Sequence, residues 1–155
     1  GVQQSGHVAS IGFHLYCKLL KRTIDLMRAN KQAHFTETKV EIPFEAKIPF
    51  FYIEDKSLRM ELYHRFGEAV ETQEVHDLYQ EIVDRFGVAP MEVQWLYMVA
   101  WIRCESSKHQ VTLIRLKNCT LQMETEKKHL SFLAPPFKTP LAFKDFVLSK
   151  LEALN

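Results

Sequence analysis

The stretch EIVDRFGVAP, residues 81–90, contains the strongest structural signal in this chain. Its first six residues end a segment in which hydrophobic residues recur at helical spacing, and Gly87 follows as the usual left-handed helix stop. Pro90 suits the first turn of another helix, because proline has no backbone N–H to donate and its φ is already helical. The stretch therefore predicts a helix that ends at Phe86, a turn, and a second helix.

The helix before Gly87 carries acidic residues on one side, namely Glu74, Asp77, Glu81 and Asp84. At about 100° per residue these four fall within about 80° of arc, and the hydrophobic residues of the helix lie on the other side. Like charges at these spacings repel, and the helix dipole disfavours an anion at Asp84, close to the C-terminus. Arg85 falls beside the acids, where we expect it to offset part of this repulsion. The acids form either a solvated face or a surface that docks on a cationic partner.

Hydrophobic periodicity predicts further helices around this stretch. They cover residues 11–29, a segment capped by Asp55 or Ser57, the segment from Pro90 to about Ser106, and a final helix that begins at Thr139-Pro140. Thr72 is the expected cap of the acid-bearing helix.

Strand patterns precede and follow these helices. Residues 39–44 alternate as an edge strand does, residues 111–116 and 120–124 flank a hairpin turn, and residues 130–133 add a strand. The order predicts an α+β fold, with a small antiparallel or mixed sheet packed with several helices and preceded by a long N-terminal helix.

Length and composition indicate one globular domain with an appended helix, since 155 residues are 46% hydrophobic and 25% charged. Cys17, Cys104 and Cys119 are too few and too widely spaced for a disulfide framework or a CxxC metal site, so we expect a reducing, cytoplasmic compartment. There is no signal peptide and no membrane-length apolar run. The chain begins at Gly1, and we interpret it as a fragment of a longer protein.

Charge is unevenly distributed along the chain although its formal total is +1. Residues 1–40 and 93–155 each carry +4, residues 41–53 carry −1, and residues 54–92 carry −6. The near-neutral total argues against bulk electrostatic binding to nucleic acid. The acidic middle favours a basic partner. A line of acids along one helix does not surround a cation, so we expect no metal site, and no phosphate-binding loop, GxSxG or HExxH motif is present.

Three motifs together resemble one protein family. QQSGH (residues 3–7), followed by IGFHLY (residues 11–16), is similar to the end of the helicase module of bacterial transcription-repair coupling factors. RMELYHR (residues 59–65) and the stretch at 81–90 resemble the C-terminal domain of those proteins. The match in order and spacing covers about residues 3–105. It implies a division into residues 1–32, the tail of the helicase module, and residues 33–155, a C-terminal regulatory domain.

The resemblance implies a parent protein that uses ATP and Mg²⁺ to translocate on double-stranded DNA, removes stalled RNA polymerase and recruits the repair protein UvrA. Gln4, Ser5 and Gly6 match a remnant of its translocation motif, whose upstream partners are missing from this chain. The C-terminal domain of the family packs on the N-terminal UvrA-binding module and masks it. Acids before the Arg-Phe-Gly segment face arginines there, and Glu81 and Asp84 occupy those positions.

The resemblance also implies structural roles for Arg59, Tyr63, Phe86, Gly87 and Pro90, and no cofactor in this fragment.

Two alternatives remain beside the docking hypothesis. A DNA-binding accessory domain would use the basic terminal segments and would bind DNA in a salt-dependent way. A small hydrolase would need two carboxylates that converge across a cleft, which a row on one helix does not supply.

Overall fold

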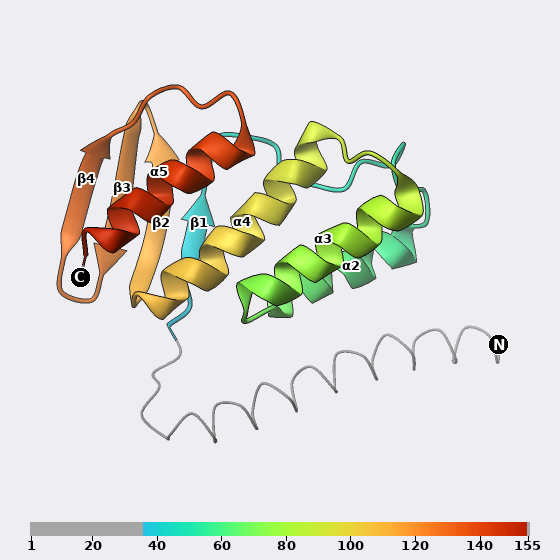
Figure 1. Ribbon diagram of the computed structural model, residues 1–155, viewed down its shortest axis with the longest axis horizontal. Helices are drawn as coiled ribbons and strands as arrows, with labels where there is room; N and C mark the ends of the chain where they lie inside the picture. The colour runs from blue at the N-terminus through green and yellow to red at the C-terminus, as the bar shows by residue number, and fades with distance from the viewer. Residues whose placement is uncertain (1–35, 155) are drawn as a thin grey trace, which may run out of the picture.

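The computed structural model describes residues 36–154 (Figure 1). Its elements are, in order, β1 (Lys39–Glu41), α2 (Lys56–Glu68), α3 (Thr72–Phe86), α4 (Met91–Lys108), β2 (Val111–Lys117), β3 (Thr120–Thr125), β4 (His129–Leu133) and α5 (Pro140–Glu152). The predicted α+β class is confirmed in this part of the chain. The helix predicted over residues 11–29 lies outside the described residues, as do Gln4, Ser5, Gly6 and Cys17.

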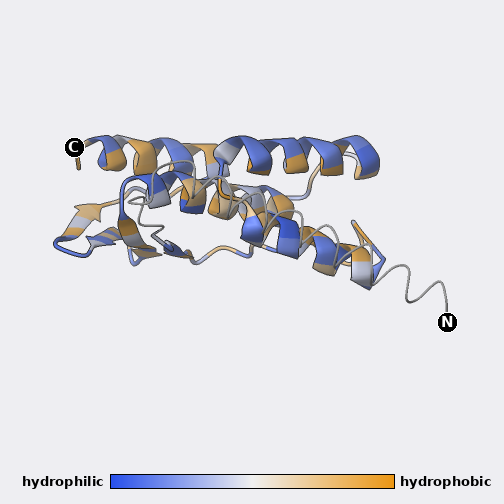
Figure 2. Cartoon of the chain, turned by 90° about the horizontal axis from the view of Figure 1, so that it is seen from below, coloured by the Kyte–Doolittle hydropathy of each residue, from blue (hydrophilic) through white to orange (hydrophobic). Residues whose placement is uncertain are grey.

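Helix α4 lies at the centre of the fold. It contacts α3 and α2 on one side, and α5, β1 and β2 on the other (Figure 1). Its buried residues lie on two opposite sides of the helix axis, with Trp95, Met98 and Ile102 on one side and Val93 and Ala100 on the other. A helix that buries two opposite sides packs between two layers of the protein. The other helices turn their hydrophilic residues outward (Figure 2).

Two hydrophobic cores share α4. The first lies between α4, the sheet and α5, and contains Trp95, Ile114, Met123 and Phe143. The second lies between α4, α2 and α3, and contains Leu62, Phe66, Val75, Leu78, Ile82 and Cys104. Tyr97 and Trp101 pack against both cores. The two halves of the domain are therefore joined through one helix.

The sheet has the order β1-β2-β3-β4. Strands β2, β3 and β4 are antiparallel neighbours, and the predicted hairpin and third strand are confirmed. Strand β1 is an edge strand, as predicted, and pairs in parallel with β2, with Val40 opposite Ile114. The sheet therefore contains both parallel and antiparallel pairs. The parallel pair requires a long crossover connection, which α2, α3 and α4 supply.

Side chains fix the starts of the helices. The Asp55 carboxylate accepts the N–H groups of Ser57 and Leu58 and caps α2, and the Thr139 hydroxyl accepts the N–H of Ala142 and caps α5. The cap predicted at Thr72 was wrong. Glu71 is the N-cap of α3 and forms a capping box with Glu74, so that two orphan N–H groups are satisfied reciprocally.

A polar row crosses the face of the sheet that points away from the core. Glu41, Arg115, Gln122 and Ser131 lie opposite one another in register. The Nε of Arg115 donates to the Glu41 carboxylate over 2.6 Å, and its Nη1 donates to Gln122. Lys39 lies 3.1 Å from the same carboxylate. These cations, Arg115 first, lower the pKa of Glu41 from 4.5 to about 2.

Acid should weaken the domain through Glu41. Its folded-state pKa lies below its usual value, so its contribution is complete above pH 4.5 and is lost as the pH falls toward 2. We expect Arg115→Met to raise the pKa of Glu41 and to make the acid loss of stability shallower. NMR titration of the Glu41 carboxyl carbon measures the pKa, and urea denaturation at several pH values between 2 and 6 measures the loss of stability. Lys39→Met is the control and should raise that pKa less, and a wild-type Glu41 that titrates near 4.5 would contradict the prediction.

Candidate functional site

The corner between α3 and α4 follows from its glycine and proline. Gly87 has φ 89° and ψ −167°, a conformation that side chains rarely adopt, and its N–H donates to the carbonyl of Val83 over 2.9 Å. Pro90 immediately precedes Met91, the first residue of α4. The predicted sequence of helix end, turn and helix start is confirmed, and the last turn of α3 is held in a defined direction.

The segment between β1 and α2 braces this corner (Figure 1). The Tyr52 hydroxyl donates to the carbonyl of Gly87 over 2.6 Å, and its ring lies 6.0 Å from the ring of Phe86. Sequence reasoning assigned no role to Tyr52, since it lies in an irregular segment 35 residues from its partner. Phe86 thus packs against the segment that braces the corner.

Two predicted structural residues of α2 hold the same segment. The guanidinium of Arg59 donates to the carbonyls of Ile53 and Glu54, both over 2.8 Å. The N–H of Ile48 donates to the Tyr63 hydroxyl over 2.7 Å. These bonds satisfy backbone groups that no regular element pairs, so the segment is ordered although it contains no helix or strand.

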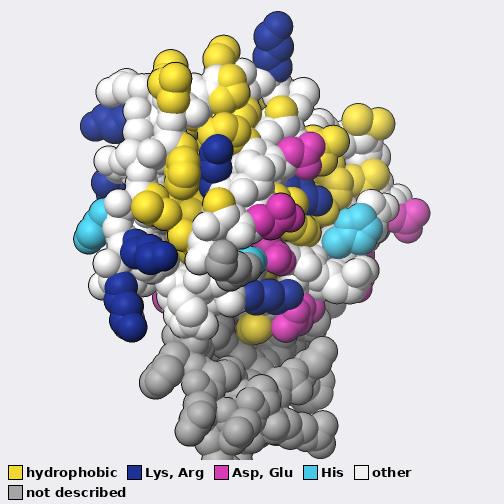
Figure 3. Space-filling view, turned by 60° about the vertical axis from the view of Figure 1, so that its left-hand side comes forward, with side chains coloured by type: hydrophobic (Ala, Val, Ile, Leu, Met, Phe, Trp, Pro, Cys, Tyr) yellow, Lys and Arg dark blue, Asp and Glu magenta, His cyan; other side chains and the backbone are white. Residues whose placement is uncertain are grey.

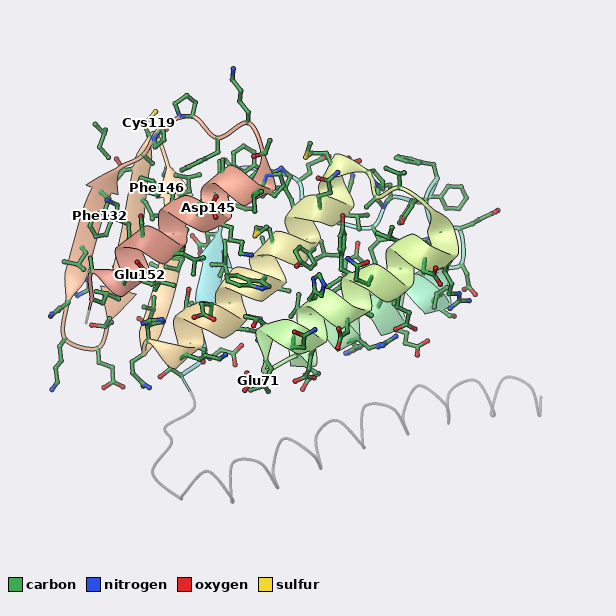
Figure 4. The ribbon with its side chains drawn as sticks, in the orientation of Figure 1. Glu71, Cys119, Phe132, Asp145, Phe146 and Glu152 are labelled. Carbon is green, nitrogen blue, oxygen red and sulfur yellow. The ribbon has the colours of Figure 1, made fainter. Side chains whose placement is uncertain are left out.

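Glu74 and Asp77 form hydrogen bonds within the domain near the start of α3. The Glu74 carboxylate accepts the N–H groups of Glu71 and Val70 at 3.3 and 3.4 Å. The Asp77 carboxylate accepts an N–H of Gln73 over 2.8 Å. Figure 4 labels Glu71 at this end of α3, away from the corner. Glu74 and Asp77 are therefore the weaker docking candidates.

Glu81 pairs with the neighbouring helix. The two guanidinium nitrogens of Arg65 donate to its two carboxylate oxygens over 3.2 and 2.8 Å, a bidentate pair that joins α2 to α3. The Glu81 side chain is still 48% exposed, while that of Arg65 is 21% exposed. The Glu81 carboxylate is thus engaged at the junction of α2 and α3 while part of its side chain remains accessible to solvent.

Asp84 lies one turn closer to the corner and is exposed. Within residues 36–154 it has no hydrogen-bond or ion-pair partner. Its neighbour Arg85 does not pair with it, and lies instead over the ring of Phe86 at 5.1 Å. We call Glu81 and Asp84 the acidic corner. The structure brings them together on the last turns of α3, and leaves Asp84 as an anion at the unfavourable end of the helix dipole.

Other chemistry in residues 36–154 is sparse. No three His, Cys, Asp or Glu side chains of this segment are grouped as metal ligands. Cys104 is buried in the second core, where its thiol donates to the Ala69 carbonyl and desolvation raises its pKa to about 11. Helices long and apolar enough to cross a membrane are not found in this segment.

Comparison with known families places this fold. A model of the TRCF domain matches residues 42–132. The chain belongs to the TRCF domain family. The match extends beyond residue 105, where the motif resemblance ends, so the hairpin and most of β4 are part of the TRCF domain as well. Residues after 106, which had no assigned role, supply three of the four strands and α5.

Whole proteins that contain similar sequences are much longer. The chain is 35% identical over 117 residues to transcription-repair-coupling factor of Bacillus subtilis, a match that covers 74% of this chain and 10% of that protein. It is 41% identical over 96 residues to the same factor of Myxococcus xanthus, covering 62% and 8%, and 30% identical over 113 residues to that of Escherichia coli, covering 70% and 10%. The TRCF domain chain thus spans about a tenth of these relatives.

A solved structure shows the same fold. The crystal structure of the C-terminal domain of transcription-repair coupling factor superimposes with a TM-score of 0.56 and 23% sequence identity, over 59% of this chain and 57% of that chain. The TRCF domain described here therefore has the α+β architecture of that C-terminal domain.

Proposed function

We propose that this TRCF domain is a non-catalytic docking domain of a transcription-repair coupling factor. In the intact protein its acidic corner binds arginines of the N-terminal UvrA-binding module and masks that module. Release of the domain then exposes the module to UvrA during repair coupled to transcription. ATP hydrolysis, DNA translocation and displacement of RNA polymerase belong to other parts of such a protein.

Asp84 is the observation that carries this proposal. It is exposed and uncompensated within the described part of the chain, at a position where the helix dipole disfavours an anion. A solvated acid could stand at many less costly places on α3. An arginine of a docked module would offset both the dipole and the repulsion from Glu81, so the geometry of the corner suits a cationic partner.

The strength of such contacts suits a switch. Exposed ion pairs contribute about 0.2–1 kcal/mol each, and pairs that are desolvated on docking contribute more. A trigger must supply at least the free energy by which the masked state is more stable than the released state. A modest contribution from each ion pair keeps that free energy small enough for release.

Asp84→Lys in the intact protein should raise its affinity for UvrA, because a lysine at the corner repels the arginines that hold the masked state. The reversal removes an ion pair that is desolvated on docking and also adds a repulsion between like charges, which together cost about 2 kcal/mol or more, so we expect an increase of about tenfold or more. Purified full-length protein and purified UvrA, compared by titration calorimetry, give the measurement. A folded Asp84→Lys protein that binds UvrA with wild-type affinity would rule out the acidic corner.

Asp145→Lys is the matched control, since Asp145 is another exposed helical acid and lies on α5, in the other half of the domain (Figure 4). It should leave UvrA affinity unchanged. Glu81→Arg is a poor test of docking, because the new arginine would face Arg65 and weaken the junction of α2 and α3. Glu81→Gln keeps a hydrogen-bond acceptor for Arg65 and is the better test of that residue.

A further inference from the structure

Large hydrophobic side chains are exposed beside the acidic corner. Phe50 is 65% exposed, Phe51 is 76% exposed and Val88 is 91% exposed. Phe51 precedes Tyr52 and Val88 follows Gly87, and the hydrogen bond between Tyr52 and Gly87 holds the two loops side by side at the end of the domain away from the sheet (Figure 1). We call Phe50, Phe51 and Val88 the apolar tip.

The turn that presents the two phenylalanines is ordered. The carbonyl of Pro49 accepts the N–H groups of Tyr52 and Ile53 at 3.0 and 3.2 Å. Arg59, which holds the end of this turn, also lies over the ring of Phe50 at 5.8 Å. Phe51 makes no ring contact with any other residue in 36–154. A preorganised backbone turn loses little entropy on binding, and aromatic side chains are enriched at interfaces.

The other exposed apolar surface of the domain differs. Figure 3 shows hydrophobic side chains gathered on the face that carries β4 and α5, with basic side chains among them. There the Lys150 ammonium lies over the rings of Phe132 and Phe146 at 5.0 and 5.1 Å, and Figure 4 shows these two rings on neighbouring elements. Lys150 thus shields that surface with its own charge, whereas the apolar tip stands beside an uncompensated acid.

Charge identifies the kind of partner that fits the tip. Residues 49–61 carry three acidic and two basic side chains, and residues 81–92 carry three acidic and one basic, so this end of the domain has a formal net charge of −3. Arg59 and Arg85 are engaged with groups of the domain itself. A partner surface that combines arginines with an apolar depression is complementary to this end.

We infer that Phe50, Phe51 and Val88 are the apolar anchor of the same docking contact, and that they insert into an apolar depression beside the arginines of the module that the acidic corner binds. This inference rests on the proposed function and identifies which side chains supply most of the affinity of the domain for the module. Exposed ion pairs alone contribute little binding free energy. Burial of two phenylalanine side chains adds a larger hydrophobic contribution. The charged corner sets the orientation and the apolar tip sets the residence time.

The test compares three full-length proteins, Phe50→Ser/Phe51→Ser, Asp84→Lys and Leu133→Ser, in their affinity for purified UvrA. Leu133 is the matched control, because it is 85% exposed on β4, in the other half of the domain. We expect the serine pair to raise UvrA affinity about tenfold or more, as Asp84→Lys does, and Leu133→Ser to change nothing. Unchanged melting temperatures show that all three proteins are folded.

The outcomes separate the two proposals. An increase with Asp84→Lys alone would overturn the apolar anchor and leave the docking function standing, and no increase with either variant would overturn both. An increase with the serine pair alone would support the tip as the docking anchor and remove the acidic corner from it. An equal increase with Leu133→Ser would overturn the specific placement at the tip.

Other partners of the tip would give a different result. The serine pair would then turn a dimer into a monomer, or weaken binding to RNA polymerase or DNA, while UvrA affinity stayed constant. Either result would overturn the inference.

Discussion

Phe143→Ala should lower the free energy of unfolding by about 3–5 kcal/mol, the largest effect that we expect from a single substitution in this domain. The Phe143 ring is completely buried and lies 5.8 Å from Trp95 and 5.2 Å from Phe137. It fills the space between α5 and α4. Its removal leaves a cavity that the rigid neighbouring rings cannot close, and domains of this size are stable by only about 5–15 kcal/mol.

Urea denaturation, followed by tryptophan fluorescence, measures this loss. Phe51→Ala is the matched control, because the same side chain is removed from an exposed site, and we expect it to change stability by less than about 0.5 kcal/mol. A loss below about 1 kcal/mol at Phe143 would show that α5 does not seal the first core as the structure indicates.

Gly87→Ala should destabilise the domain by about 1–3 kcal/mol. No atom lies within 4 Å of the position where the new Cβ would stand, so the cost comes from the backbone. A φ of 89° with a ψ of −167° is a conformation for glycine almost alone. The strain can relax only if the turn between α3 and α4 changes shape, which would break the hydrogen bond from Tyr52 to Gly87.

Gly67→Ala provides a control of opposite sign. Gly67 lies in α2, does not have a positive φ, and has open space around its Cβ position. Alanine there should stabilise the domain by about 0.5–1 kcal/mol, because glycine is a poor helix former. Thermal melting distinguishes the two changes. If both alanines stabilised the domain, Gly87 would not hold the conformation described here.

Local patterns predicted most of the elements. The helices α2, α3, α4 and α5 follow from hydrophobic spacing and caps within each segment, and the hairpin of β2 and β3 follows from one turn. The N-cap of α3 was placed one residue late, because the reciprocal bonds of Glu71 and Glu74 outcompete the hydroxyl of Thr72. The parallel pairing of β1 with β2 joins Val40 to Ile114, and no local signal specifies a partner so far along the chain.

The candidate site was predicted only in part, because local patterns do not show contacts between distant segments. A single-helix projection located the four acids of α3 correctly relative to its hydrophobic side. It could not show that Arg65 of α2 reaches Glu81, since that contact depends on how two helices pack. It also gave no reason to expect Phe50 and Phe51 at the surface. The turn after Pro49 that exposes them was not predicted, because proline after a strand also fits an extended segment, and large hydrophobic residues are more often buried.

The position of α4 has a mechanical consequence. A helix that borders both cores cannot slide or rotate against one of them without disturbing the packing of the other, because both interiors are close-packed. The sheet half and the helical half therefore move as one rigid body. A force applied at the corner of α3 and α4 is carried through α4 to the sheet, so under the proposed docking function we expect release to move the described domain as a whole and not to open it internally.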